Sequence, residues 1–123
     1  MASGIRVVLA GARGRVGSVL VPALKAEAGI DLTAALGRGD DLADALVGAD
    51  VLVDFTAPVA APGNAMLATG KGVAPIVGTS GLDPALVDEL ERSCAGRGGA
   101  VIPNFALGAV LMMRLAELAA PHL

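Results

Sequence analysis

Three glycines spaced three residues apart are the feature of this chain best suited to chemistry. Gly11, Gly14 and Gly17 follow the strand-like run 5–10 and precede a helical pattern. A tight glycine turn between a strand and a helix lets the backbone approach the pyrophosphate of a dinucleotide, which the helix N-terminus attracts. The spacing differs from the commoner G-x-G-x-x-G, and an ordinary strand-to-helix turn is the alternative. We favour nucleotide binding because of the strand and helix on either side.

Charged residues near the glycines indicate the charge of the ligand and which dinucleotide is bound. Arg13 and Arg15 inside the loop favour an anion, although a single arginine is more often a solvated surface residue. After the second strand, a carboxylate usually holds the ribose of NAD, whereas an arginine accommodates the 2′-phosphate of NADP. Gly37 stands at that position and Arg38 follows it, which favours NADP(H) or the use of both cofactors. The aspartates at 40–41 lie close enough to supply the carboxylate instead.

Small polar clusters follow each of the three later strand-like runs. They are Asp54-Phe55-Thr56, Gly78-Thr79-Ser80-Gly81 and Pro103-Asn104-Phe105. Parallel sheets bind ligands at the carboxyl ends of their strands, so these clusters are expected to converge on one crevice. The alternative for Thr56, Ser80 and Asn104 is that each only caps a loop or a helix, as these residue types often do.

Acid–base and metal chemistry find little support in this chain. His122 is the only histidine and stands next to the last residue, where side chains usually fray. Cys94 is the only cysteine and has no histidine near it in sequence, so we expect it to pack as a small apolar group. Lys25 and Lys71 are expected on solvated faces. We therefore expect a cofactor site without catalytic residues and without a metal site.

The elements that must position these residues alternate between strand and helix, which predicts an α/β fold. We expect a Rossmann-like, doubly wound parallel sheet of about five strands in three layers. A single domain over 1–123 is consistent with the length. The expected strands are 5–10, 31–36, 51–55, 74–77 and 100–102. The expected helices are 14–28, with Val16, Val19, Leu20, Ala23 and Leu24 on its buried face, then 41–47, 58–69 beginning at Pro58, 84–95 and 107–120.

Composition narrows the possible partners and the compartment. The formal net charge is −3, which argues against nucleic acid as a partner. Hydrophobic residues make up 54% of the chain, as buried parallel strands require, yet the most apolar stretch, 101–120, contains Pro103, Asn104, Arg114 and Glu117. We therefore expect no membrane association, no secretion signal and a cytoplasmic location.

The last expected helix is apolar around more than one face. Val110, Leu111, Met112 and Met113 are consecutive, and Leu115 and Leu118 follow them. A helix of this kind is normally covered on all sides. We expect a partner subunit, a further domain or additional strands to cover it.

The motifs, taken in order, resemble the 4-hydroxy-tetrahydrodipicolinate reductase (dihydrodipicolinate reductase) family. The resemblance covers essentially the whole chain. It is carried by Ile5-Arg6-Val7, Gly11-Ala12-Arg13-Gly14-Arg15-Val16-Gly17, Val53-Asp54-Phe55-Thr56-Ala57-Pro58, Val77-Gly78-Thr79-Ser80-Gly81 and Pro103-Asn104-Phe105-Ala106-Leu107-Gly108. In combination these blocks are specific to the family.

The resemblance implies an N-terminal domain that binds NADPH or NADH and a hydride transfer to a dihydrodipicolinate ring in diaminopimelate and lysine biosynthesis. It also implies that the glycine loop holds the pyrophosphate, that the residues after the second strand flank the adenine ribose, and that the last two clusters line the nicotinamide. The cofactor-binding residues implied in this way are Gly11, Ala12, Arg13, Gly14, Arg15, Val16, Gly37, Arg38, Gly78, Thr79, Ser80, Pro103, Asn104 and Phe105.

This chain departs from the family pattern in three places. Ser80 replaces a threonine and keeps the hydroxyl, and Gly37 replaces an acidic residue found in many members. The family's C-terminal substrate domain, with its His/Lys block, is absent from this chain. We therefore expect the chain alone to bind cofactor without turning over substrate, and the full-length family member to bind a small-molecule substrate and to form a homo-oligomer.

Two other functions remain open at this point. The first is a free-standing dinucleotide-binding or sensing module without catalysis, whose apolar last helix serves dimerisation. The second is the corresponding domain of another amino-acid dehydrogenase, which the D-F-T and P-N-F-A-L-G blocks disfavour.

Overall fold

Five parallel strands form one sheet, and the helices lie beside it. The computed structural model describes residues 4–123. The strands are β1 (Ile5–Ala10), β2 (Ile30–Leu36), β3 (Val51–Asp54), β4 (Ala74–Val77) and β5 (Ala100–Val101), in the order β2-β1-β3-β4-β5. The helices are α1 (Arg15–Ala26), α2 (Leu42–Ala45), α3 (Ala61–Gly70), α4 (Pro84–Ser93), α5 (Leu107–Ala119) and the short 3₁₀ helix η1 (Ala120–His122).

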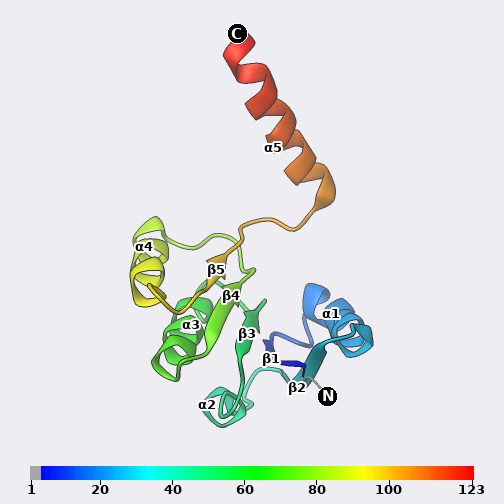
Figure 1. Ribbon diagram of the computed structural model, residues 1–123, viewed down its shortest axis with the longest axis vertical. Helices are drawn as coiled ribbons and strands as arrows, with labels where there is room; N and C mark the ends of the chain where they lie inside the picture. Colours follow the sequence, from blue (N-terminus) through cyan, green and yellow to red (C-terminus); the bar gives the residue numbers. More distant parts are fainter. Residues whose placement is uncertain (1–3) are drawn as a thin grey trace.

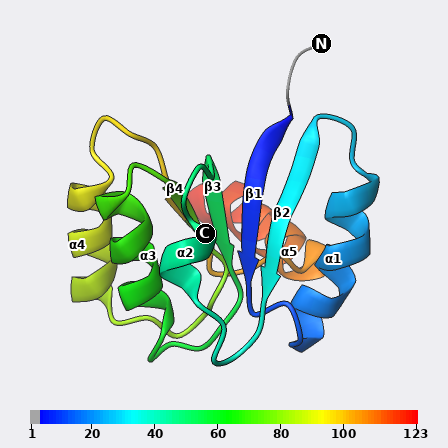
Figure 2. The ribbon, with the colours of Figure 1, turned by 90° about the horizontal axis from the view of Figure 1, so that it is seen from below.

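The helices occupy both faces of the sheet. Figure 1 shows α1 on one face and α2, α3 and α4 on the other. Crossovers between parallel strands are right-handed. The step from β1 to β2 runs in the opposite direction to the later steps, so α1 falls on the opposite face. The predicted doubly wound α/β fold is confirmed. Figure 2 shows α1 beside β2 and α3 and α4 near β4.

The main core lies between the sheet and the α2–α3 layer. Val8 of β1 and Leu52 of β3 are fully buried against Leu46, Ala68 and Val73. Side chains alternate along each strand, so the same face of β3 that carries Leu52 also carries the carboxylate at the end of the strand. This alternation buries a charged residue at the carboxyl edge of the sheet.

Helix α1 differs from its prediction in the face that it buries. Gly17 is its one buried residue, and Leu20 and Leu24 are half-buried. Val16 and Val19, which were expected on the buried face, are 46% and 68% exposed, and Ala23, expected there too, is also exposed. The reason is that α1 packs mainly on β2 and β1, which leaves its outer flank open.

Helix α3 begins three residues later than predicted. Pro58 lies in a turn in which the amides of Ala60 and Ala61 donate to the carbonyl of Ala57, both at 2.9 Å. The helix starts at Ala61, which places Pro62 in its first turn. A proline is tolerated there because first-turn amides have no partner within the helix.

Helix α5 extends away from the sheet and from the other helices (Figure 1). None of its residues is buried, and Leu107 and Met112 are 84% and 70% exposed. Nothing within residues 4–123 covers its apolar faces, as its sequence led us to expect. None of the helices in the described part of the chain has the length and apolar character needed to cross a bilayer.

Candidate functional site

The glycine loop connects β1 to α1 and leaves no space for side chains at two positions. Gly11 has a φ of +84°, and a Cβ there would overlap the carbonyl of Phe55. A Cβ on Gly17 would overlap the carbonyl oxygen of Gly11. The amides of Gly11 and Ala12 donate to the carbonyl of Leu36, at 3.0 and 2.9 Å, which fixes the loop against the end of β2.

The first turn of α1 has unpaired donors. Gly14 is its N-cap and provides no side-chain hydrogen bond, and the turn contains no acidic residue. The amides of Arg15, Val16 and Gly17 therefore have neither an intrahelical acceptor nor a neighbouring carboxylate. Together with the positive end of the helix dipole, they form a site that suits a phosphate.

The end of β2 lies against the glycine loop through the side chain of Arg13. A Cβ on Gly37 would lie 2.8 Å from Nη1 of Arg13, so the absent side chain at position 37 makes room for the guanidinium. Asp40 accepts from the Gly37 amide at 2.8 Å, and its Oδ2 lies 3.9 Å from Nη2 of Arg13. Asp41 instead caps α2 by accepting from the amide of Asp44 at 3.1 Å.

A cleft of about 600 Å³ opens beside this loop. It lies where the strand order reverses between β1 and β3, the usual ligand position in doubly wound sheets. Its lining residues come from the ends of β1, β2 and β3 and from the start of α3. They are Ala10, Gly11, Arg13, Gly14, Leu36, Gly37, Arg38, Gly39, Asp40, Leu42, Phe55, Thr56, Ala57, Val59, Ala60 and Asn64.

Five of the residues implied by the family resemblance line the cleft, namely Gly11, Arg13, Gly14, Gly37 and Arg38. Three others belong to the loop and to α1 without lining the cleft. Ala12 is buried, whereas Arg15 and Val16 are exposed on the first turn of α1.

The predicted clusters after β4 and β5 lie along the same edge of the sheet but outside this cleft. A Cβ on Gly78 would overlap the ring of Phe55, and that ring lies 5.3 Å from the ring of Phe105. Ser80 and Pro103 are exposed. Asn104 accepts from the amide of Ala106 at 2.9 Å, so it caps the turn before α5.

Asp54, at the end of β3, connects the β3 and β4 clusters. It is completely buried, and its Oδ1 accepts from the Thr56 amide at 2.9 Å and from the Thr56 hydroxyl at 2.6 Å. The same oxygen accepts from the Thr79 hydroxyl at 3.2 Å, and Oδ2 accepts from the side-chain amide of Asn64 at 2.8 Å. Asn64 was not predicted as a site residue, although it is the only side-chain amide on α3, which is otherwise mostly apolar.

The opposite edge of the sheet carries a different carboxylate. Asp50 accepts from Nε and Nη2 of Arg6, at 3.0 and 2.8 Å, and from the Arg6 amide at 2.8 Å. The hydrogen bond from the guanidinium lowers the pKa of Asp50 from 3.8 to about 2, and the same bond raises the pKa of Arg6. This pair lies at the amino ends of the strands, away from the cleft.

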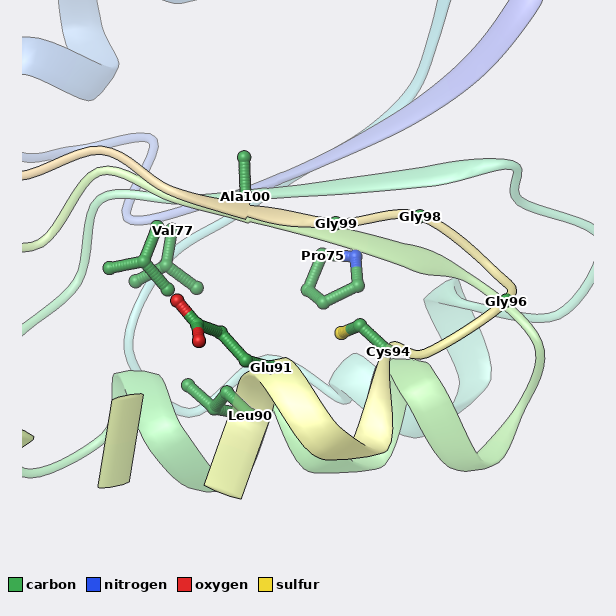
Figure 3. Close-up of a pocket in the computed structure, with 10 residues that line it drawn as sticks. Pro75, Val77, Leu90, Glu91, Cys94, Gly96, Gly98, Gly99 and Ala100 are labelled. Atoms are coloured by element: carbon green, nitrogen blue, oxygen red, sulfur yellow. The ribbon is translucent and has the colours of Figure 1, made fainter. Parts of the chain in front are cut away.

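A second cavity, of about 350 Å³, lies between α4 and the strands β4 and β5. Figure 3 shows Glu91 and Cys94 extending from α4 towards β4. Cys94 is half-buried, with Sγ 3.7 Å from Oγ1 of Thr69 and 2.9 Å from where a Cβ on Gly99 would lie. Cys94 thus packs in this region as expected. His122 is exposed in η1, and residues 4–123 bring together no group of side chains suited to a metal ion.

The sheet order and the glycine loop beside the cleft place the chain in the class of Rossmann-like dinucleotide-binding domains. Residues 5–105 match the family model described as dihydrodipicolinate reductase, N-terminus. The chain is 39% identical over 146 residues to the 4-hydroxy-tetrahydrodipicolinate reductase of Moorella thermoacetica, covering 99% of this chain and 55% of that protein. It is 42% identical over 120 residues to the Nocardia farcinica reductase, with 94% and 48% covered.

Solved structures give the same result. The dihydrodipicolinate reductase of Paenisporosarcina sp. TG-14, solved with dipicolinate bound, superposes with a TM-score of 0.85 at 30% identity, covering 95% of this chain and 54% of that one. The myo-inositol 2-dehydrogenase of Lactobacillus plantarum has a TM-score of 0.65 at 16% identity, covering 80% and 36%, and shares the fold alone. The chain belongs to the dihydrodipicolinate reductase family and corresponds to its N-terminal domain. It spans about half the length of the curated relatives that it matches.

Proposed function

We propose that this chain is the NAD(P)H-binding domain of a 4-hydroxy-tetrahydrodipicolinate reductase. The observation that carries the proposal is the uncapped N-terminus of α1, which follows a glycine loop that tolerates no side chain at Gly11 or Gly17 and borders the cleft. Bound nicotinamide cofactor would supply a hydride to the substrate ring, in the diaminopimelate and lysine route. The substrate-binding residues would belong to the part of the family's length that this chain does not span, so the chain alone is expected to bind cofactor without turnover.

The cofactor is proposed to run along the carboxyl edge of the sheet. The amides of Arg15 and Val16 would bind the pyrophosphate, and Gly37 and Arg38 would flank the adenine ribose. The nicotinamide would lie near the two later clusters, Gly78-Thr79-Ser80 and Pro103-Asn104-Phe105. The packing of Phe55 on Gly78 and Phe105 supports this placement, because it joins those clusters to the wall of the cleft.

NADPH is the proposed preferred cofactor, and NADH is the alternative cofactor for the same site. Gly37 has no side-chain carboxylate to hold the ribose diol, and the guanidinium of Arg13 lies where a side chain at position 37 would be. Arg38 adds a second cation to the cleft lining. Asp40 is the carboxylate in the same lining that keeps NADH binding possible, whereas Asp41 is used in capping α2.

Calorimetric titration of the purified chain with NADPH and NADH tests this proposal. We expect micromolar binding of NADPH, and we expect Arg13→Ala and Arg38→Ala each to weaken NADPH about tenfold while changing NADH less, since each removes one charge-assisted contact to phosphate. Arg92→Ala on the exposed side of α4 is the matched control. A folded chain that binds neither cofactor would contradict the proposal.

The remaining expectations concern the complete enzyme. On the strength of the family resemblance, we propose that it acts in the cytoplasm, takes a small dicarboxylate heterocycle as substrate and forms a homo-oligomer. The dipicolinate in the Paenisporosarcina reductase supports the substrate class. Sedimentation of the full-length protein and a spectrophotometric assay of NADPH oxidation test the oligomer and the activity separately.

A further inference from the structure

We propose that Asp54 is a positioning residue. It holds the loops that follow β3 and β4 in fixed relative positions, so that one cofactor molecule can contact both. The inference rests on the proposed function. It arises from an unusual combination: a completely buried carboxylate on the central strand β3 (Figure 1) that forms no ion pair within residues 4–123. Burying a carboxylate is costly unless hydrogen bonds replace its lost hydration.

Four hydrogen bonds from neutral donors replace that hydration. They come from three segments that are separate in sequence: Thr56 after β3, Asn64 on α3 and Thr79 after β4. A fully satisfied buried network of this kind favours one arrangement of its donors over others. Asp54 therefore fixes the relative positions of the three segments.

Two of the donor residues form part of the cleft, and the third adjoins the proposed nicotinamide region. Thr56 and Asn64 line the cleft, whereas Thr79 follows Gly78, which packs against Phe55. Asp54 itself is not among the lining residues and is completely buried. It would therefore act through its neighbours and would not touch the cofactor.

The adenosine half of the cofactor offers an internal reference. Its proposed contacts, Arg13, Gly37 and Arg38, lie on the glycine loop and at the end of β2, and none of them bonds to Asp54. A ligand confined to this half should tolerate loss of the network better than a ligand that spans both halves. The ratio of NADPH affinity to 2′,5′-ADP affinity consequently reports whether the two loops keep their relative positions. A general loss of folded protein lowers both affinities and leaves the ratio unchanged.

The experiment is calorimetric titration of the 123-residue chain with NADPH and with 2′,5′-ADP, alongside thermal unfolding of each variant. Asp54→Ala should lower the ratio about tenfold, the equivalent of one to two hydrogen bonds. Asp54→Asn should restore most of the ratio, because its oxygen can keep the two threonines while its amide donates to a reoriented Asn64. The matched control is Asp50→Asn at the opposite edge, which should leave the ratio unchanged.

The possible outcomes separate a failure of the inference from a failure of the proposed function. An Asp54→Ala variant with the wild-type ratio would overturn the inference and leave the proposed function standing. If Asp54→Ala does not fold, Asp54→Ser decides: its single oxygen cannot accept all four hydrogen bonds, every proposed cofactor contact stays in place, and the ratio should fall about threefold or else the inference fails. A wild-type chain that binds neither ligand overturns the proposed function, and the inference with it.

Discussion

The two ends of β3 treat a carboxylate in opposite ways. Asp50 stands just before the strand, with its side chain 42% exposed, and is paired with the guanidinium of Arg6. Asp54 ends the strand, is completely buried and is held by neutral donors alone. The same residue type, four positions apart, is thus paired with a cation at one edge and with neutral hydrogen-bond donors at the other.

If the cofactor binds as proposed, the two edges of the sheet serve different purposes, stability at one and binding at the other. At the amino edge, a cation and an anion neutralise each other and join β1 to the segment before β3. At the carboxyl edge, the buried carboxylate uses no cation, and Arg13 and Arg38 face the cleft. Within residues 4–123, Arg13 forms one ion pair, with Asp40 at 3.9 Å. Changes to carboxyl-edge residues that form the cleft or the glycine loop should therefore alter ligand binding, and changes at the amino edge should alter stability alone.

The largest effect is expected for Gly17→Ala. The added Cβ would overlap the carbonyl oxygen of Gly11, which belongs to the backbone and cannot rotate away. We expect a loss of about 1–3 kcal/mol in the free energy of unfolding and at least a hundredfold weaker NADPH binding. Urea unfolding and calorimetry measure the two effects. Gly63→Ala on α3, where a Cβ meets nothing within 4 Å, is the control, and unchanged binding by Gly17→Ala would break the comparison.

Gly37→Asp should change the preference between cofactors. The new carboxylate would displace the flexible end of Arg13 and offer two acceptors to a ribose diol. We expect the ratio of NADPH to NADH affinity to fall about tenfold, measured by titration of both cofactors. Gly37→Ala adds the Cβ without the charge and should produce a smaller change. Equal effects of the two substitutions would show that sterics, not charge, set the preference.

Asp83→Ala sharpens the comparison because Asp83 lies at the carboxyl edge without facing the cleft. Its side chain caps α4 by accepting from the Ala85 amide at 2.8 Å. We expect a loss of about 1 kcal/mol in the free energy of unfolding and no change in NADPH binding. Urea unfolding measures the first and calorimetry the second. Asp88→Ala, on the exposed side of the same helix, is the control, and weaker cofactor binding by Asp83→Ala would contradict the expectation.

Asp50→Asn is expected to have the smallest effect, a loss of stability that is present above pH 4 and disappears in acid. The hydrogen bond from Arg6 lowers the folded-state pKa of Asp50 to about 2, below its ordinary 3.8. The pair therefore contributes stability above pH 4, and this contribution is lost as the pH falls from about 4 to 2. Urea unfolding across this range should show a shallower pH dependence in the variant. Glu117→Gln, in the exposed Arg114–Glu117 pair on α5, serves as the control, and identical slopes for wild type and Asp50→Asn would refute the assignment.

Much of the fold was predictable because strands and glycine turns leave local signals. The runs of β1, β3 and β4 and the positions of Gly11 and Gly17 could be identified from neighbouring residues alone. The start of α3 was placed wrongly because a proline at 58 and another at 62 both fit a first turn, and only the bonds to Ala57 decide between them. The buried face of α1 was partly wrong because apolar periodicity does not show how far the sheet beneath a helix extends.

The site was less predictable because its contacts are not local. The partners of Asp54 include Asn64 and Thr79, which are 10 and 25 residues further along the chain. The D-F-T block marked the position of Asp54 without indicating that its side chain is completely buried and does not line the cleft. The packing of Phe55 on Gly78 likewise depends on the pairing of β3 with β4, which brings Asp54 opposite Val77.

The two-residue length of β5 has a consequence for the chain in solution. An open sheet exposes the unpaired amides and carbonyls of its outer strands, and these can recruit strands from other molecules and start aggregation. At one margin, β5 offers only two residues of ladder, preceded by Gly98 and Gly99. At the other margin, the pairing of β2 with β1 shifts register between Val7 and Val8, which interrupts a regular template. Both outer strands are therefore poor templates for pairing with strands of other molecules.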